Sequence, residues 1–270
     1  MSTTPLLQIR GLTKRFGGLT AVKSIDLDVP DCKVVSIIGP NGSGKTTFFN
    51  LISGLYEPTE GRLLLRQADA TTVELVGRKP YEITQQGVAR TFQNLRLFPQ
   101  MTVLENVMVG MHARTQEGLF AALLRTRRFK EEEARIRHEA AELLKFFGEL
   151  LYPVREEAAR NLSYANQRRL EIVRAMATRP RLLLLDEPAA GMNPTEKHGL
   201  MLDIRRLRDS GYTILLIEHD MTLVRSISDH TIAFDHGEKI AEGTFDEVRQ
   251  TPQVIEAYLG KGAAGAAAHA

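Results

Sequence analysis

One stretch of the chain has the spacing G-x-x-x-x-G-K-[ST], which suits the binding of a nucleoside triphosphate. It consists of Gly39, Pro40, Asn41, Gly42, Ser43, Gly44, Lys45 and Thr46, followed by Thr47. The backbone N–H groups of such a loop, together with the positive end of the helix that follows, surround a polyphosphate. Lys45 can reach the β- and γ-phosphates, and the hydroxyl of Thr46 can bind Mg²⁺. We therefore predict a triphosphate site here.

Two carboxylates follow the apolar run Leu182–Leu185 and suit metal binding and hydrolysis. The carboxyl end of a parallel strand beside a phosphate loop faces the ligand crevice, where Asp186 can hold Mg²⁺ directly or through water. Glu187 can polarise a water aimed at the γ-phosphorus. An Asp-Glu pair after leucines is often only a solvated strand end. Beside a phosphate loop, we favour the functional interpretation.

Two further polar residues give weaker signals. His219 follows the apolar segment Thr213–Ile217, from which it could reach the γ-phosphate. Gln93 lies in Thr91-Phe92-Gln93-Asn94, and its amide could bind both Mg²⁺ and water. Judged by residue type alone, a histidine at a strand end is usually structural or exposed, and Gln93 is more often an exposed loop residue.

These residues need an α/β scaffold to bring them together. The apolar runs 34–38, 182–185 and 213–217 predict buried parallel strands, and 45–52 predicts a helix. Alternating segments between 6 and 29 predict strands of an antiparallel flank, and further strands are expected at 61–65 and 231–234. A helical period from about 103 to 147 predicts a helical insertion, and a closing helix is expected over 244–259.

The composition is that of a globular protein with a sizeable core: 270 residues, 43% hydrophobic and 25% charged. No run approaches the roughly 18 apolar residues of a membrane span, and the N-terminus lacks a signal-peptide pattern. The single cysteine, Cys32, excludes an internal disulfide and suits a reducing compartment. A net charge of +2 gives no argument for nucleic acid. The charge run 125–133 is interpreted as a solvated helix face.

Five separated motifs agree in order and spacing with the ATP-binding subunits of ABC transporters, which the chain resembles over residues 5–260. They are the phosphate loop, Gln93, Leu162-Ser163-Tyr164-Ala165-Asn166-Gln167, the segment 182–188 and His219. The resemblance implies an α/β fold with a P-loop (RecA-like) core, an antiparallel β flank and an α-helical subdomain. It implies a core of residues 5–93 and 176–260, a helical subdomain at about 94–175, and a low-complexity tail at 261–270.

The same resemblance implies an ATPase that uses ATP and Mg²⁺. Phe16 would stack on the adenine with Val22 beside it. Catalysis would rest on Glu187, His219 and Gln93, and Mg²⁺ on Thr46, Gln93 and Asp186. Two subunits would hold two ATP molecules head to tail. Each ATP would lie between the phosphate loop of one subunit and Ser163 and Ala165 of the other.

Within the family, the chain is similar to the branch for uptake of branched-chain or other hydrophobic amino acids. The stretches Glu218-His219-Asp220-Met221 and Ala257-Tyr258-Leu259-Gly260 contribute to this likeness. It implies an importer subunit on the cytoplasmic face of the bacterial inner membrane. The partners would be a homologous ATPase subunit (heterodimer or homodimer), two transmembrane permease subunits and a periplasmic solute-binding protein, with no nucleic acid. The alternatives are a urea or amide importer and a non-transport regulatory ABC ATPase.

The chain departs from the family at Ala165 and Asn166, where a glycine and a glutamine are usual. An alanine at position 165 costs about 1–2 kcal/mol if its φ is left-handed, and this cost vanishes if the backbone is helical. We therefore hypothesise a heterodimer in which the ATP site that uses Ala165 and Asn166 is weakened.

Overall fold

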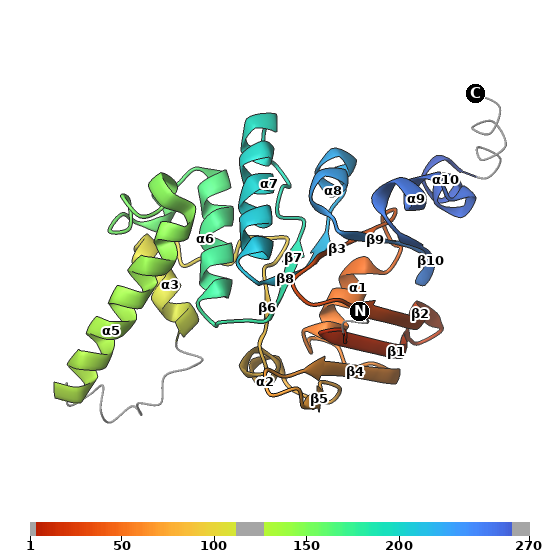
Figure 1. Ribbon diagram of the computed structural model, residues 1–270, viewed down its shortest axis with the longest axis horizontal. Helices are drawn as coiled ribbons and strands as arrows, with labels where there is room; N and C mark the ends of the chain where they lie inside the picture. The colour runs from red at the N-terminus through yellow and green to blue at the C-terminus, as the bar shows by residue number, and fades with distance from the viewer. Residues whose placement is uncertain (1–3, 112–126, 261–270) are drawn as a thin grey trace.

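The computed structural model describes residues 4–111 and 127–260 and contains two β-sheets flanked by helices (Figure 1). The larger sheet has six strands in the order β10-β9-β3-β8-β7-β6. Its strands are β3 (Val34–Ile38), β6 (Val88–Arg90), β7 (Leu182–Asp186), β8 (Thr213–Ile217), β9 (His230–Asp235) and β10 (Glu238–Gly243). All neighbours pair in parallel except β9 and β10, which form an antiparallel hairpin.

The smaller sheet is antiparallel and has the strand order β2-β1-β4-β5. It consists of β1 (Leu7–Phe16), β2 (Leu19–Val29), β4 (Glu60–Arg66) and β5 (Thr72–Glu74). Helix α1 (Lys45–Ile52) packs between this sheet and the larger one, because its buried phenylalanines share one apolar cluster with residues of both sheets. The short helix α2 (Pro80–Gln85) precedes β6.

The central strands β3, β7 and β8 consist mostly of apolar residues because both faces of the larger sheet are covered. Leu182 and Leu184 of β7 pack on the α1 side, whereas Leu183 and Leu185 pack on the opposite side. This division follows from the period of two along a strand. All five positions of β3, β7 and β8 are buried.

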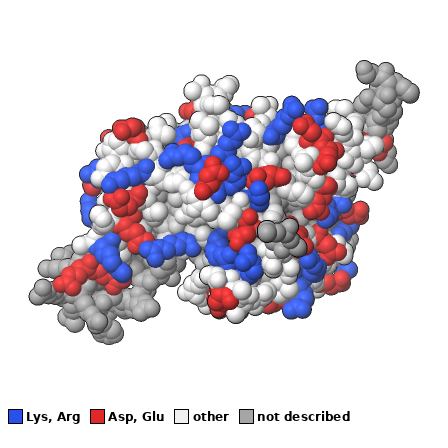
Figure 2. All heavy atoms as spheres, in the orientation of Figure 1, with Lys and Arg blue, Asp and Glu red and all other residues white. Residues whose placement is uncertain are grey.

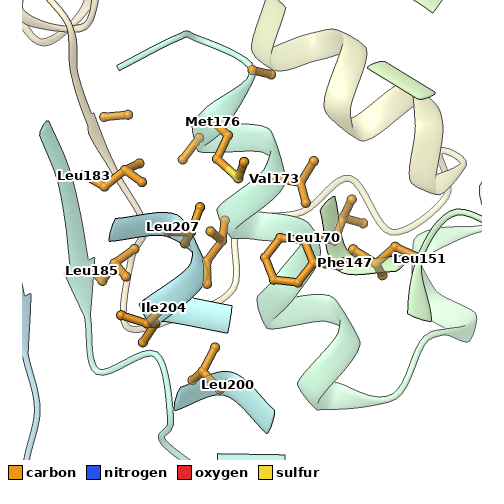
Figure 3. Close-up of a cluster of buried hydrophobic side chains, with 14 of the residues drawn as sticks. Phe147, Leu151, Leu170, Val173, Met176, Leu183, Leu185, Leu200, Ile204 and Leu207 are labelled. Atoms are coloured by element: carbon orange, nitrogen blue, oxygen red, sulfur yellow. The ribbon is translucent and has the colours of Figure 1, made fainter. Parts of the chain in front are cut away.

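The opposite face of the sheet carries the remaining long helices. They are α3 (Val103–Met111), α5 (Arg127–Leu144), α6 (Tyr164–Met176), α7 (Pro194–Asp209) and α8 (Met221–Ile227), with short 3₁₀ segments at Lys145–Leu150 and Ala159–Asn161. Helix α3 packs against α5 and α6 at the end of the molecule away from the smaller sheet (Figure 1). One apolar cluster joins this helical part to the sheet (Figure 3). It includes Phe147, Leu151, Leu170, Val173, Met176, Leu183, Leu185, Leu200, Ile204 and Leu207.

The α/β class and the parallel strands predicted from the apolar runs are confirmed, but the single closing helix is wrong. The structure has α9 (Phe245–Gln250) and α10 (Pro252–Leu259), with Thr251 extended between them. Pro252 has no N–H to continue the first helix and disfavours a helical conformation at the residue before it. The tail 261–270 and the first two residues of the charge run, 125–126, lie outside the described residues.

Acidic and basic side chains alternate over the face of the molecule seen in Figure 2, with no large field of one sign. Among residues 4–111 and 127–260, no helix combines the length and apolar character needed to cross a bilayer.

Candidate functional site

A cavity of about 770 Å³ opens at the carboxyl ends of the central strands. One side is formed by β1, β2 and the turn between them, and the floor by the phosphate loop and the start of α1. Polar residues that follow β6, β7 and β8 complete it. The lining comprises Phe16, Gly18, Leu19, Thr20, Ala21, Lys23, Asn41, Gly42, Ser43, Gly44, Lys45, Thr46, Thr47, Gln93, Glu187, His219, His236 and Gly237.

The phosphate loop connects β3 to α1 and is packed too tightly for side chains at two positions. A Cβ on Gly39 would lie 2.2 Å from the Phe234 carbonyl oxygen, and one on Gly44 would lie 2.5 Å from that of Ala21. Gly44 also has a φ of 101°, which glycine adopts without strain. The loop therefore presents bare backbone at the point where α1 begins.

Lys45 is held within this loop. Its Nζ donates hydrogen bonds to the carbonyl oxygens of Gly39 at 2.7 Å and Pro40 at 2.8 Å. Burial lowers the pKa of Lys45, and the carboxylates of Glu187 and Asp186 act in the opposite direction. The ammonium is thus a partly desolvated cation beside two acids, which suits it to bind phosphate oxygens. Gly39 and Pro40 support the lysine from behind and do not line the cavity.

Glu187 is held from two sides by residues of neighbouring elements. Its Oε1 lies 2.6 Å from Nε2 of His219, which follows β8. Its Oε2 accepts a hydrogen bond of 2.9 Å from Nε2 of Gln93, which follows β6. The backbone of Glu187 has a φ of 47°, an uncommon conformation for a residue with a side chain, and its N–H donates to the Ile217 carbonyl. Both carboxylate oxygens therefore have a fixed direction at the edge of the cavity.

Asp186 lies one residue earlier and behind this cavity wall. It is 2% exposed, and its Oδ2 accepts a hydrogen bond of 2.8 Å from Nη2 of Arg90. Burial raises the pKa of Asp186, while the Arg90 guanidinium acts to lower it. Asp186 does not line the cavity, although the next residue, Glu187, does.

The oxygen donors at this edge fit a magnesium ion that arrives with a nucleotide. The Thr46 hydroxyl and the Gln93 amide both line the cavity, and hard oxygen ligands are those that Mg²⁺ prefers. Among the described residues, no group of three or more His, Cys, Asp or Glu side chains could hold a metal unaided. The remaining ligands would therefore be phosphate oxygens and water, as is usual for Mg²⁺.

Phe16 stands at the mouth of the cavity and is 42% exposed. Its ring meets that of Tyr56 edge-on at a centroid distance of 5.3 Å, and Nζ of Lys14 lies 5.0 Å from its centre. The placing of Val22 beside the base stays a prediction. Val22 is fully buried in the apolar cluster between the two sheets and does not line the cavity, whereas the preceding residue, Ala21, does.

Ser163 and Ala165 lie at the start of α6 and do not line this cavity. Ser163 is the N-cap, and its hydroxyl oxygen accepts a hydrogen bond from the Asn166 N–H at 3.3 Å. Ala165 is helical and 2% exposed, and it packs in the apolar cluster of Figure 3. The left-handed strain considered for Ala165 is therefore absent. A role for either residue in a second subunit's site stays a prediction.

Two buried charged residues were missed by reasoning from the sequence. Arg90 contacts Asp186, and Glu218 accepts hydrogen bonds from the N–H groups of Ala189 at 2.8 Å and His219 at 3.0 Å. Burial raises the pKa of Glu218, although these backbone donors act to lower it. Each is a charged residue at the end of an apolar strand, and that pattern was the available signal.

Comparison with known proteins places the chain in a family. A family model described as "ABC transporter" matches residues 22–190. A second model, "Branched-chain amino acid ATP-binding cassette transporter", matches residues 238–264. The chain is 46% identical over 258 residues to the high-affinity branched-chain amino acid transport ATP-binding protein BraF of Pseudomonas aeruginosa, covering 95% of this chain and 98% of that protein. It is 47% identical, with the same coverage, to LivG of Escherichia coli strain K12, which has the same description.

Solved structures give the same result. The ADP conformation of an ATP-binding cassette of an ABC transporter superposes with a TM-score of 0.80 at 32% identity, covering 95% of this chain and 99% of that one. A dimeric post-hydrolysis cassette bound to ADP and Pi superposes with a TM-score of 0.71 at 26% identity, covering 88% and 98%. The cavity between the phosphate loop and Glu187 thus belongs to a fold that holds nucleotide in its relatives. The chain is a member of the ABC transporter family of ATP-binding cassettes.

Proposed function

We propose that this chain is the ATP-binding and hydrolysing subunit of an importer for branched-chain or other hydrophobic amino acids. The observation that carries the ATPase assignment is Glu187, held between His219 and Gln93 beside the phosphate loop. The amino-acid assignment is supported by the descriptions of the relatives and of the family model that matches residues 238–264.

In the proposed reaction, the loop N–H groups and Lys45 bind the β- and γ-phosphates, and Phe16 stacks on the base. Thr46, Gln93 and Asp186 would hold Mg²⁺, which supplies positive charge against the phosphate oxygens. Without a nucleotide, the ammonium of Lys45 is bound by the carbonyl oxygens of Gly39 and Pro40. When the nucleotide binds, phosphate oxygens would replace these two carbonyls.

Glu187 orients and polarises the attacking water. A carboxylate acts on a water only if one of its oxygens points toward it, and a freely rotating side chain would spend little time in that position. His219 and Gln93 restrict this rotation from opposite sides. Because His219 also lines the cavity, it is placed to contact the γ-phosphate. When it does so, its hydrogen bond with Oε1 of Glu187 would break, which leaves this oxygen free to bind the water.

The proposed complex contains further subunits at the cytoplasmic face of the inner membrane. A homologous ATPase subunit would complete the ATP site of this chain by supplying the segment equivalent to residues 162–167, and this chain would supply its own residues 162–167 to the site of that subunit. Two permease subunits and a periplasmic solute-binding protein would complete the importer. Asn166 is one methylene shorter than the glutamine usual there, and its Oδ1 accepts a hydrogen bond of 3.3 Å from Nη1 of Arg169. Because the ATP site that uses Asn166 would therefore be weakened, we propose a heterodimer in which the other site is intact.

Hydrolysis by the purified chain, beside a Glu187→Gln variant, tests this function. We expect Mg²⁺-dependent phosphate release by the parent. In the variant, release should fall by about 10²–10⁴-fold, the usual contribution of a general base, while ATP binding persists.

The molar mass of the variant with ATP, alone and with the homologous subunit, distinguishes a homodimer from a heterodimer. A parent that binds no nucleotide would refute the assignment.

Uptake measurements test the transported solute. In cells that lack the gene for this chain, we expect uptake of radiolabelled leucine, isoleucine or valine to fall and to recover with the parent gene but not with Glu187→Gln. Loss of urea uptake with unchanged leucine uptake would instead support the urea or amide importer.

A further inference from the structure

The side chain of Arg90 forms hydrogen bonds with residues of two other elements, β7 and the end of α1. Arg90 is the last residue of β6, and its side chain is 6% exposed. Nη2 donates to Oδ2 of Asp186 at 2.8 Å. Nη1 donates to Oδ1 of Asn50 at 2.6 Å and to the Ser53 hydroxyl at 3.0 Å. One guanidinium therefore connects the end of β7 to the end of α1, the helix that begins with Lys45.

Aromatic rings fix the orientation of the same guanidinium. Its central carbon lies 5.5 Å from the ring centre of Phe49 on α1 and 5.2 Å from that of Phe92. Phe92 immediately precedes Gln93, and its carbonyl oxygen accepts a hydrogen bond of 2.8 Å from Nη1 of Arg168 on α6. A planar fork between two rings is a geometry that arginine satisfies and lysine does not.

The fold alone does not account for an ion pair at this place. Replacing a buried ion pair with apolar residues of similar volume is often neutral or stabilising, so such a pair is weak evidence for a stabilising role. The hydrogen bond from Arg90 to Oδ2 instead sets the direction in which Oδ1 of Asp186 points.

We propose that Arg90 is a positioning residue for metal-nucleotide binding, which fixes the Asp186 carboxylate at a set spacing from the α1 residues Lys45 and Thr46. The inference rests on the proposed ATPase function. Arg90 does not line the cavity. It acts through Asp186, as the hydrogen-bonding partners of metal-binding carboxylates do in general, and removal of such partners typically costs 10- to 100-fold in metal affinity.

The test measures binding of a fluorescent ATP analogue, in the Glu187→Gln background so that no hydrolysis occurs, with Mg²⁺ titrated from zero. For Arg90→Gln we expect the Mg²⁺ concentration at half-maximal enhancement of binding to rise about 10- to 100-fold. Affinity for the analogue in excess EDTA should stay within about twofold, because the loop and Phe16 are unchanged. Arg90→Lys keeps the charge without the fork and should give a smaller shift in the same direction.

Arg66→Gln is the matched control. Arg66 pairs with Asp31 at 2.6 Å beside Arg181 and Thr213, at the amino ends of β7 and β8 and away from the cavity at their carboxyl ends, so its loss should leave the Mg²⁺ requirement unchanged. Equal loss of binding with and without Mg²⁺ in Arg90→Gln would show a structural role only and would overturn the proposal, as would an unchanged Mg²⁺ requirement. If Arg90→Gln does not fold, the same Mg²⁺ titration is carried out on Asn50→Ala. An unchanged Mg²⁺ requirement in Asn50→Ala would then overturn the proposal. A parent without Mg²⁺-dependent binding would instead refute the proposed function.

Discussion

Glu187 depends on its neighbours more than on its own backbone for its direction. Its φ of 47° is uncommon, and the hydrogen bond from its N–H to Ile217 holds it there. The side chain then meets His219 at 2.6 Å and Gln93 at 2.9 Å. Catalytic residues often occupy such sparsely populated backbone regions, where the surrounding structure maintains the strain.

Replacing His219 should therefore reduce turnover without preventing binding. For His219→Ala we expect ATP hydrolysis to fall about 100-fold or more, since Glu187 loses one of its two restraints and the γ-phosphate loses a contact. ATP affinity should change by less than about threefold, because the loop and Lys45 supply most of the phosphate contacts. Steady-state phosphate release and equilibrium binding measure the two effects separately.

His230→Ala provides the control for this variant. Its Nε2 lies within hydrogen-bonding distance of Oε1 of Glu242, at 2.9 Å, outside the cavity. Turnover should stay within about twofold of the parent. Equal activity in the His219 and His230 variants would contradict the role given to His219.

At the scale of the elements, Asp31 joins the smaller sheet to the larger one. It lies in the turn between β2 and β3, and its carboxylate accepts hydrogen bonds from Arg66 at 2.6 Å, Arg181 at 3.2 Å and the Thr213 hydroxyl at 3.0 Å. Partial burial acts to raise the pKa of Asp31. The hydroxyl and the two guanidinium groups outweigh it, so the pKa lies below its ordinary value of 3.8.

This pKa makes the stabilising effect of Asp31 depend on pH. A carboxyl whose pKa is lower in the folded state stabilises the fold above its unfolded pKa, and the effect is lost as pH falls through the folded value. For Asp31→Asn we expect the free energy of unfolding at pH 7 to fall by about 1 kcal/mol, an amount reduced by the partial exposure of the pair. Urea unfolding should show this difference shrinking below pH 3.8. Asp28→Asn, in a half-exposed pair with Arg10, should change stability by less than about 0.5 kcal/mol.

The sequence predicts best the strands that are buried on both faces, because such strands are continuous apolar runs. The run 182–185 is apolar throughout and the run 213–217 is apolar after Thr213, and they form β7 and β8 as predicted. The facing of Val22 was not predictable from residue type, because valine suits either face of a strand at a cavity wall. Arg90 was missed because its partners, Asp186 and Asn50, are far from it in the sequence.

At the scale of the whole molecule, a single apolar cluster joins the helical part to the sheet (Figure 3). Leu170 and Val173 of α6 lie in the same cluster as Leu183 of β7 and Ile204 of α7. Close-packed interiors transmit strain, so a cavity created in the helical part should also destabilise the packing against the larger sheet.

Leu170→Ala should therefore destabilise the described fold as one unit. Leu170 is fully buried, and we expect the free energy of unfolding to fall by about 2–5 kcal/mol. Urea unfolding followed by circular dichroism and by tyrosine fluorescence should give coincident transitions at a lower midpoint. Leu202→Ala, at a position on α7 that is 44% exposed, should shift stability by no more than about 0.5 kcal/mol. Two separate transitions would contradict a shared core.

The edge-on contact between Phe16 and Tyr56 has a practical consequence for spectroscopy. The chain contains no tryptophan, and Phe16 stands half-exposed at the mouth of the cavity. A tryptophan introduced there by Phe16→Trp would be the sole indole in the molecule, beside the ring of Tyr56 and at the place proposed for the adenine. Its emission would follow the arrival and departure of unlabelled nucleotide in real time, giving an optical signal without a chemical dye.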